Sequence, residues 1–443
     1  MQKETSKGRW IALLPILVFL VMYLGLGITF EYLLKIPMGF YNIPIVVSFL
    51  TALIVACLQN RALSFDDKLK IMANGVGDKN ILTMILIFMA AGVFVGVVGR
   101  SSAESVAYFL LSIIPANYAV LVMFIVSCFI SVSMGTSVGT ITLITPIAVA
   151  LAKSSGFNPA ICIGAVMSGA MFGDNLSFIS DTTIAACNGQ GCAMKDKFKA
   201  NFWIALPAAL VTVFIFYLKT ANIEIVPIAH TEYNLIQIIP YVIVLAGGII
   251  GINVFIVLLT GIISGSVIML ATGQVAPTEL LSSMGKGAEG MYETTMVAIL
   301  VSAICALIQQ YGGFTALLNF IKSVFKSRKS GKLGMGILVG AMDIATANNT
   351  VAIVMANPIA KEMSDEYGIS PQNAASILDT FSCIFQGIIP YGAQMLVAIA
   401  AAADLGIEIS AFEIMPNLYY PYMLLISCLI FIFVIGDKKN NKK

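Results

Sequence analysis

Three aspartates interrupt apolar stretches of the chain, and they are the residues best suited to do chemistry. Asp174 and Asp181 lie seven residues apart, and Asp379 lies in the second half. A carboxylate at the centre of a membrane helix costs about 2.5 to 3.5 kcal/mol, so each of these acids needs a charged partner, a proton or a functional use. Carboxylate and hydroxyl oxygens are the ligands that small hard cations prefer. The acids therefore predict a cation site.

Hydroxyl and amide side chains surround the first two acids. The candidates for ion or proton binding beside them are Asn175, Ser177, Ser180, Thr182 and Thr183. Gly173 and the density of serine and threonine favour an unwound or re-entrant segment over a continuous helix. The alternative is that both acids cap a helix end at the water surface, because three lysines follow soon after: Lys195, Lys197 and Lys199.

Further polar interruptions are expected to break helices or to bind substrate. In the first half they are Thr136 and Ser137, and in the second they are Asp343, Asn348, Asn349, Thr350, Gln386, Tyr391 and Gln394. Oxygens at a helix break suit a cation, and freed backbone N–H groups suit an anion. Threonine and serine are also ordinary packing residues of membrane helices, which is the alternative for Thr136 and Ser137.

An internal duplication indicates how these residues are positioned. When the chain is shifted by 212 residues against itself, prolines and glycines coincide: Pro146 with Pro358, Gly156 with Gly368, and Pro159 with Pro371. A repeat of about half the length of an apolar chain indicates duplicated membrane halves with a site between them. In this register Asp174 falls on Gln386, and Asp379 falls on Met167. The halves thus share the polar breaks but not the acids.

The composition places the chain in a lipid bilayer. Apolar residues make up 59% of it and charged residues only 11%, against about 25% charged residues in an ordinary soluble domain. With about 20 residues per span, the charge-free stretches predict about ten to fourteen membrane elements. The first stretch follows Lys3, Lys7 and Arg9 and shows no small-residue cleavage site. We therefore expect a retained helix and a cytoplasmic N-terminus.

The loop charges indicate that the two halves have opposite orientations. Residues 61–79 carry four basic side chains, whereas their repeat partner, residues 273–291, carries only Lys286. The next pair of loops has the reverse bias: residues 101–116 have no lysine or arginine, and the corresponding turn has Lys322, Lys326, Arg328, Lys329 and Lys332. The positive-inside rule then places equivalent loops on opposite faces. The alternative is chance scatter of a few lysines.

We therefore predict an all-α polytopic membrane protein made of two inverted-topology repeats with discontinuous helices and re-entrant segments. The first repeat covers residues 1–222 and the second covers residues 223–443. The lysine-rich end, residues 438–443, is consistent with a cytoplasmic C-terminus.

Several functional classes are disfavoured. The eight cysteines show no disulfide or zinc spacing and are interpreted as small apolar residues. With His230 as the one histidine, histidine-based metal binding or catalysis is not expected. An intramembrane aspartyl protease would need a Gly-x-Gly-Asp loop, but Met171 occupies the first glycine position. We expect no enzyme activity, no cofactor and no nucleic-acid partner.

Residues 173–183 read Gly-Asp-Asn-Leu-Ser-Phe-Ile-Ser-Asp-Thr-Thr. This stretch resembles the GD-x-x-S-x-x-S-[DE]-TT signature of NhaC-type sodium/proton antiporters, which belong to a wider ion-transporter superfamily. In the second half, Asp379 followed by Ile389-Pro390-Tyr391 is similar to that family's acidic residue ahead of an Ile-Pro-[Trp/Tyr] segment. Typical members carry a lysine where this chain has Asn175, so a possible internal counter-ion is missing at that position.

The resemblance implies a secondary active transporter of the plasma membrane that exchanges Na+ for H+ by alternating access. A buried carboxyl group holds its proton more tightly than a solvated one, so Na+ and H+ compete for buried aspartates. Asp181 and Asp379 are the main candidates for Na+. The runner-up function is Na+- or H+-coupled transport of a small organic solute, an amino acid or a carboxylate, which the amide side chains would suit. A homodimer is compatible with either function.

Overall fold

The structure is a computed structural model that describes residues 8–36, 42–113, 115–177, 180–221, 233–250 and 252–435. The predicted repeat boundary at 222/223, His230, residues 178 and 179 of the acidic motif and the lysine-rich C-terminal end lie outside these ranges. Within them the regular structure is entirely helical, as an apolar chain requires, because in lipid each backbone N–H and C=O must be paired inside its own segment.

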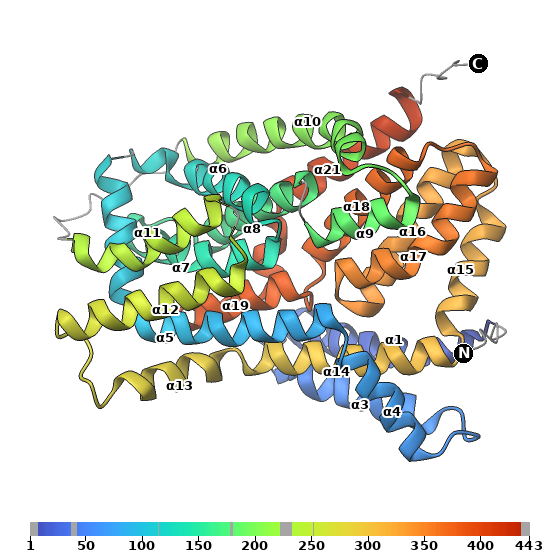
Figure 1. Cartoon of the computed structure of the whole chain (residues 1–443), viewed down its shortest axis with the longest axis horizontal. Helices are drawn as coiled ribbons and strands as arrows, with labels where there is room; N and C mark the ends of the chain where they lie inside the picture. The colour runs from blue at the N-terminus through green and yellow to red at the C-terminus, as the bar shows by residue number, and fades with distance from the viewer. Residues whose placement is uncertain are drawn as a thin grey trace.

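The α-helices of the first half follow one another closely (Figure 1). They are α1 (Leu14–Leu20), α2 (Leu26–Ile28), α3 (Ile45–Leu58), α4 (Phe65–Val76), α5 (Lys79–Ile113), α6 (Ala116–Met134), α7 (Ser137–Ser155), α8 (Pro159–Leu176), α9 (Asp181–Gln190) and α10 (Met194–Thr220). The first segment also contains a 3-10 turn and two π-helical turns at Trp10–Leu13, Val21–Gly25 and Thr29–Leu33.

The second half has a corresponding series. Its helices are α11 (Leu235–Ile250), α12 (Val254–Ala271), α13 (Leu280–Gly290), α14 (Tyr292–Gln310), α15 (Gly313–Val324), α16 (Arg328–Thr346), α17 (Asn349–Glu366), α18 (Pro371–Ile388), α19 (Ala393–Asp404), α20 (Ala411–Ile414) and α21 (Tyr419–Ile430). A 3-10 turn precedes α21 and a π-helical turn follows it, at Met415–Asn417 and Phe431–Ile435.

Eight helices in the described ranges are long and apolar enough to cross a membrane, or nine if the bent pair Ala411–Asn417 and Tyr419–Val434 is one span. This number is below the predicted ten to fourteen elements. Shorter apolar helical stretches, which the prediction of membrane elements also includes, lie at Ile45–Leu58, Tyr118–Val132, Leu235–Val244 and Gly313–Val324. Polar residues also lower the hydropathy of the interrupted helices.

The helix breaks fall at equivalent positions of the two halves. Helix α6 ends at Gly135 with φ +68°, and 212 residues later α16 ends at Ala347 with φ +47°. The next residue caps the following helix in both halves: Thr136 accepts the N–H of Gly139, and Asn348 accepts the N–H of Val351. These contacts satisfy donors that a helix start leaves unpaired. The predicted discontinuous helices are thus confirmed.

A second pair of breaks obeys the same register. Helix α8 ends at Leu176 and α9 begins at Asp181, while α18 ends at Ile388 and α19 begins five residues later at Ala393. Asp174 and Asp181 therefore do not share the face of one continuous helix, in agreement with the unwound segment that the sequence predicts. In both halves the preceding helix begins with proline at its first position, which needs no N–H donor there.

The short helix after each break packs against the other half. Helix α9 contacts α17 and α18, and α19 contacts α7 and α8; Figure 1 shows α9 beside α17 and α18, and α19 beneath α7. Helices α8 and α18 cross where the Cys383 thiol donates to the carbonyl of Met171, its own equivalent in the register, at 3.4 Å. A contact between equivalent residues is expected where an approximate two-fold axis passes between the halves.

Exchanging the residues at the two left-handed breaks should change stability in opposite directions. A left-handed backbone costs a residue with a Cβ atom about 1 to 2 kcal/mol, and glycine avoids this cost. Ala347→Gly should therefore raise the midpoint of thermal unfolding in detergent, and Gly135→Ala should lower it. Ala345→Gly, inside α16, is the control and should lower the midpoint because glycine is a poor helix former. A loss of stability in Ala347→Gly would contradict the left-handed geometry.

Candidate ion-binding site

A buried ion pair lies at the centre of the site. Asp379, in the middle of α18, pairs with the Nζ of Lys197, near the start of α10, and each side chain is only 1% exposed. The ammonium also donates to the carbonyl of Asn175 at 2.7 Å and to the Oγ1 of Thr183 at 2.9 Å. These three acceptors use the three N–H groups of lysine. The ammonium is therefore complete in hydrogen bonding, and it joins α8, α9, α10 and α18.

Asn175 gives the Asp379 carboxylate a second hydrogen bond, and a network of amide side chains holds Asn175 in place. Asn175 donates to the Oδ2 of Asp379 at 3.3 Å, and Asn201 on α10 donates to both the backbone oxygen and the Oδ1 of Asn175, at 2.7 and 2.8 Å. The Oδ1 of Asn201 in turn accepts the hydroxyls of Ser376 and Thr380, each at 2.8 Å. Ser376 and Thr380 are four residues apart and lie on the same face of α18.

Asp174 is the second buried acid of this cluster. Its side chain is 6% exposed, and its Oδ2 accepts the hydroxyl of Ser137, the first residue of α7, at 2.7 Å. The Nε2 of Gln394 on α19 donates to the same hydroxyl at 2.6 Å, so the chain of hydrogen bonds crosses from the second half to the first. Asp379 is near enough for its charge to act on Asp174. The interpretation of Asp174 as a water-exposed cap is wrong, because the side chain is buried.

Asp181 occupies a different environment. It is the first residue of α9 and is exposed, while Ser180 is the N-cap and accepts the N–H of Thr183 at 3.1 Å and shares a hydrogen bond of 2.7 Å with Thr182. The charge of Lys79, at the start of α5, acts on Asp181. Among the described residues no contact joins Asp181 to Asp379, so the two residues predicted to bind Na+ are not brought together in this conformation.

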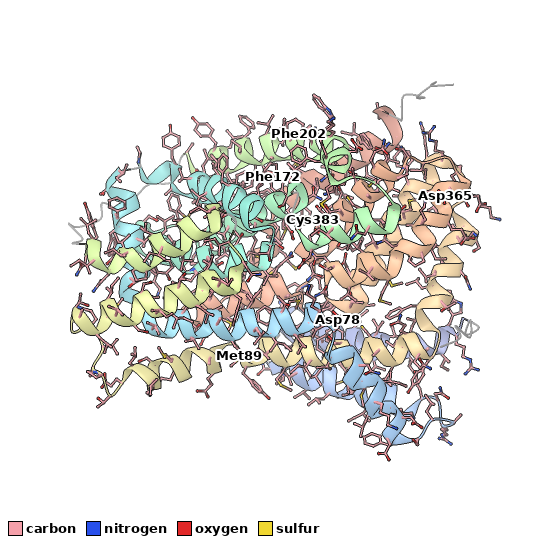
Figure 2. All side chains as sticks on the ribbon, in the orientation of Figure 1. Asp78, Met89, Phe172, Phe202, Asp365 and Cys383 are labelled. Atoms are coloured by element: carbon pink, nitrogen blue, oxygen red, sulfur yellow. The ribbon has the colours of Figure 1, made fainter. Side chains whose placement is uncertain are left out.

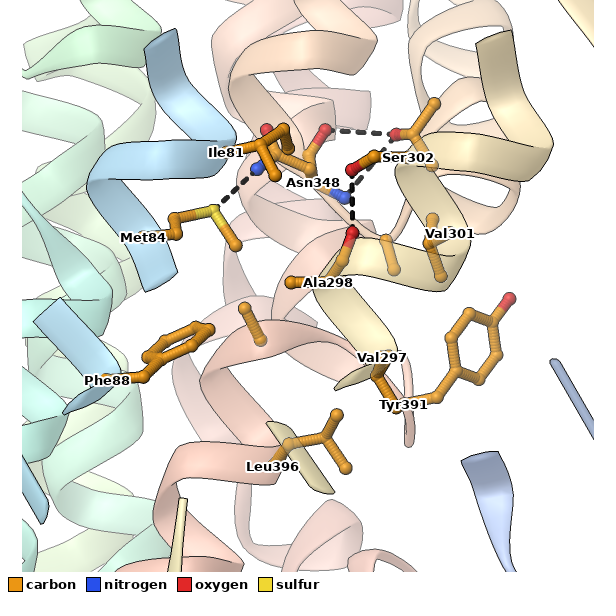
Figure 3. Close-up of a pocket in the computed structure, with 13 residues that line it drawn as sticks. Ile81, Met84, Phe88, Val297, Ala298, Val301, Ser302, Asn348, Tyr391 and Leu396 are labelled. Atoms are coloured by element: carbon orange, nitrogen blue, oxygen red, sulfur yellow. Dashed lines mark hydrogen bonds between the residues drawn. The ribbon is translucent and has the colours of Figure 1, made fainter. Parts of the chain in front are cut away.

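The polar residues at the second-half break mostly hold its backbone. Asn348 caps α17 and also donates to the Sδ of Met84 at 2.8 Å, a contact that Figure 3 shows. The Oδ1 of Asn349 accepts the N–H of Thr350 at 3.0 Å. Tyr391 donates to the carbonyl of Ile344 at 2.7 Å, and Gln386 donates to the carbonyl of Ala347 at 2.9 Å. In the first half, Ser177 donates to the carbonyl of Val132 at 2.8 Å.

A water-accessible vestibule leads toward this break. Its volume is about 430 Å³, and its polar lining includes Asn74 and Asp78 near the α4–α5 turn, Gln309 on α14 and Thr346 at the end of α16; Asp78 is labelled in Figure 2. Thr346 also borders a smaller cavity of about 20 Å³ next to Asn348 and Tyr391 (Figure 3). This smaller cavity has room for about one water molecule.

Sequence reasoning missed Lys197 and Asn201. The three lysines after the motif suggested a solvated helix end, and Lys195 and Lys199 are indeed exposed. Lys197 instead begins a buried face of α10 that continues through Asn201, Ala205 and Ala208, a spacing typical of one side of a helix. That spacing was the available signal. The expectation that the chain lacks an internal counter-ion at the motif is corrected, because Lys197 supplies one from the next helix.

The site contains more buried acid than buried base. Asp174, Asp343 and Asp379 lie in the interior, and the charge of Asp379 acts on both of the others. Lys197 is the lysine that contacts this cluster; the buried Lys68 instead donates to the carbonyls of Cys57 and Gln59. Buried carboxylates without enough counter-charge must hold protons or cations. The described part of the chain contains no cluster of three or more His, Cys, Asp or Glu side chains that is placed to hold a metal ion.

The family comparison identifies the class of protein. The sequence model of the Na+/H+ antiporter family matches residues 10–220 and again residues 216–435, so one pattern describes each half. The chain belongs to the Na+/H+ antiporter family. This is a family of secondary transporters and not of enzymes, and together with the apolar helices it makes the protein a multi-pass protein of the plasma membrane.

The relatives of this chain match it over different shares of its length. An uncharacterized Na+/H+ antiporter of Haemophilus influenzae is 22% identical over 361 residues, 72% of this chain and 77% of the relative. The Na+/H+ antiporter NhaC of Bacillus subtilis is 23% identical over 379 residues, 76% of this chain and 82% of the relative. The malate-2H+/Na+-lactate antiporter of the same organism is 26% identical over 205 residues, 46% of this chain and 42% of the relative.

Removing one partner of the central ion pair should destabilise this family member more than removing both. Lys197→Met leaves the Asp379 carboxylate buried without its cation, which typically costs about 3 to 5 kcal/mol. The double variant Lys197→Met with Asp379→Asn should recover much of the loss in thermal unfolding midpoint. Lys199→Met, on the exposed face of α10, is the matched control and should have little effect. Additive losses in the double variant would show that the pair does not act as a unit.

Proposed function

We propose that the protein exchanges Na+ for H+ by alternating access, with the two ions competing for the carboxylates of Asp174 and Asp379. The observation that carries this proposal is the position of these two acids, buried together at the contact between the halves, with Lys197 paired to Asp379. Family membership supports Na+ and H+ as the transported ions.

The contacts of the two acids suggest different parts in the exchange. Asp174 accepts a neutral hydroxyl, so in a dry interior it needs a proton or a metal cation to balance its charge. Na+ arriving at Asp174 would replace that proton. At Asp379 the balancing charge is Lys197, and Na+ would have to displace the ammonium. Because Lys197 joins α8, α9, α10 and α18, its displacement would couple ion binding to a change in helix packing.

Each half packs one short helix against the other half, and this arrangement supports alternating access. Helices α9 and α19 each pack on the opposite half, so a rotation of one half against the other would close one approach and open the other. The vestibule lies beside α4, whose surroundings, residues 61–79, carry four basic side chains. By the positive-inside rule this face is cytoplasmic, as are both termini, and the conformation described is open to the inside.

The position of Asp181 suits the entrance of the pathway that leads from the vestibule to the buried acids. It shares a helix face with Ala185 and Asn188, which line a groove of about 450 Å³ between α9 and α17. Val354 of α17 lines both this groove and the vestibule. An exposed carboxylate there would attract Na+ toward the buried acids. We therefore assign Asp181 to cation capture, with Asp174 and Asp379 as the exchange site.

The antiport should be visible without any added solute. In proteoliposomes with an imposed Na+ gradient and a lumenal pH dye, the wild-type protein should move protons against the flow of Na+, and Asp174→Asn and Asp379→Asn should abolish this signal because they remove the competing carboxylates. Asp181→Asn should raise the Na+ concentration needed for half the maximal rate and leave the maximal rate nearly unchanged.

Asp365→Asn is the matched control for these variants, because Asp365 is 64% exposed in a pair with Lys361 at the rim of the molecule (Figure 2). It should transport like the wild type. Proton movement that persists in Asp379→Asn at the wild-type rate would exclude Asp379 from the exchange site.

Coupled transport of a small organic solute is the second candidate function. The likeness to a malate-2H+/Na+-lactate antiporter favours it, as do two buried amides whose oxygens lack a hydrogen-bond partner in the structure, Gln386 and Gln394. If this function holds, a hydroxy-carboxylate or amino acid should raise the thermal unfolding midpoint more in Na+ than in K+, and the wild type should move no protons until that solute is added. Proton movement with Na+ alone would rule out an obligatory solute.

A further inference from the structure

Asp343, near the end of α16, is a buried acid that the exchange site does not use. Its side chain is 0% exposed, and neither carboxyl oxygen accepts a hydrogen bond of normal geometry, the hydroxyl of Ser382 on α18 being the neighbouring donor. The Oε1 of Gln386 on the adjacent α18 is also buried without a partner. All three atoms are acceptors. A buried carboxylate in such surroundings would be left without compensation, whereas a carboxylic acid would carry its own donor and no charge.

The ionisable groups on the elements packed around Asp343 offer no counter-charge. Asp379 and Cys383 face it from α18, and Tyr391 faces it from the segment before α19. Cys305, on α14, lies close by and donates its thiol to the carbonyl of Ala345 at 3.3 Å. Lys197 is engaged by Asp379. Lys332, on α16 itself, lies over the ring of Phe431, 5.6 Å from its centroid and eleven residues before Asp343.

The fold does not require an acid at this position. The equivalent residue of the first half is Ser131, at the same distance from its helix break. The hydroxyl of Ser131 donates to the carbonyl of Ala170 on α8 at 2.5 Å, so a neutral group closes the same helix contact. In the second half the residue equivalent to Ala170 is Ser382, whose hydroxyl donates to the carbonyl of Asn349 at 3.4 Å. A serine hydroxyl is therefore sufficient to close this helix contact, and the fold does not need the carboxyl group of Asp343 for it.

A route for protons reaches the vicinity of Asp343. Thr346, one helical turn later, borders both the vestibule of about 430 Å³ and the small cavity of about 20 Å³. Tyr391 lines that small cavity as well, and Cys305 lines the vestibule. One water molecule in the cavity would lie between bulk water and the last turn of α16.

We propose that Asp343 carries a second proton of the transport cycle, separate from the proton that Na+ displaces at Asp174. The carboxylic acid releases H+ to water when its approach is open on one side of the membrane, and the carboxylate takes up H+ on the other side. The proposal rests on the proposed antiport function. It assigns one proton per cycle to a residue that need not touch Na+.

The test is the number of protons exchanged per Na+ in proteoliposomes, measured from the combination of Na+ gradient, pH gradient and membrane potential at which net flux stops. Asp343→Asn resembles the protonated acid in shape and charge, and Asp343→Ser copies Ser131. Each variant should still exchange Na+ for H+ but with one proton fewer per Na+ than the wild type. Asp343→Glu, which keeps a carboxyl group, should restore the wild-type ratio, and Asp365→Asn should leave it unchanged.

The outcomes separate the two proposals. If the wild type moves no protons with Na+, the antiport function fails and the assignment of Asp343 fails with it. If the wild type exchanges both ions and Asp343→Asn or Asp343→Ser keeps the same ratio, Asp343 is a structural residue and only this inference is overturned. Because Asp343→Ser reproduces a residue that the fold already accepts in the first half, it provides a folded variant should Asp343→Asn not assemble.

Discussion

The cost of burying a carboxylate in an apolar interior determines how this site is built. Asp379 lies in the middle of α18, and its charge is balanced by Lys197 on α10. The lysine in turn needs acceptors for its remaining N–H groups, and one of them is the carbonyl of Asn175. This carbonyl is available because α8 ends one residue later and provides no helical donor for it. The helix break is therefore part of the solution to a buried charge and not only a feature of the fold.

The two halves share their backbone plan but not their charges. Each polar group of the cluster has an uncharged equivalent 212 residues away: Asp174 and Gln386, Asp343 and Ser131, Asp379 and Met167, Lys197 and Ile409. A two-fold fold provides two similar approaches to one centre, which alternating access requires. An ion has to bind at one place on the way through, so the charges need not repeat. Where the two halves carry different residues at equivalent positions, the fold accepts both residues. The charged one of each pair is therefore not needed for folding.

The breaks were predictable from sequence because they are local. Gly135 and the caps Thr136 and Asn348 mark helix ends by residue type, and the register places each on an equivalent position. Burial of Asp174 and Asp379 also followed from their apolar surroundings. The partner of Asp379 did not, because Lys197 lies 182 residues away and its neighbours Lys195 and Lys199 are solvated. Asp181 resembled Asp174 in sequence, yet the break at Leu176 turns it toward solvent.

The contacts between the halves lie at different distances from the crossing of α8 and α18. This distance decides which contacts would have to change if access to the site switched from one side of the membrane to the other. The hydrogen bonds around Asp379 join α8, α10 and α18, so the ion pair spans both halves at their crossing. Nearer the rim, Asn357 of α17 accepts Gln190 at 3.0 Å and donates to the carbonyl of Ala185 at 2.9 Å, and any Cβ atom at Gly189 would lie 2.0 Å from its amide carbon. A rotation about the crossing of α8 and α18 moves the rim far more than the centre. The proposed alternating access would therefore require the α9–α17 contact to slide or break, whereas Asp174 and Asp379, near the axis, would move least.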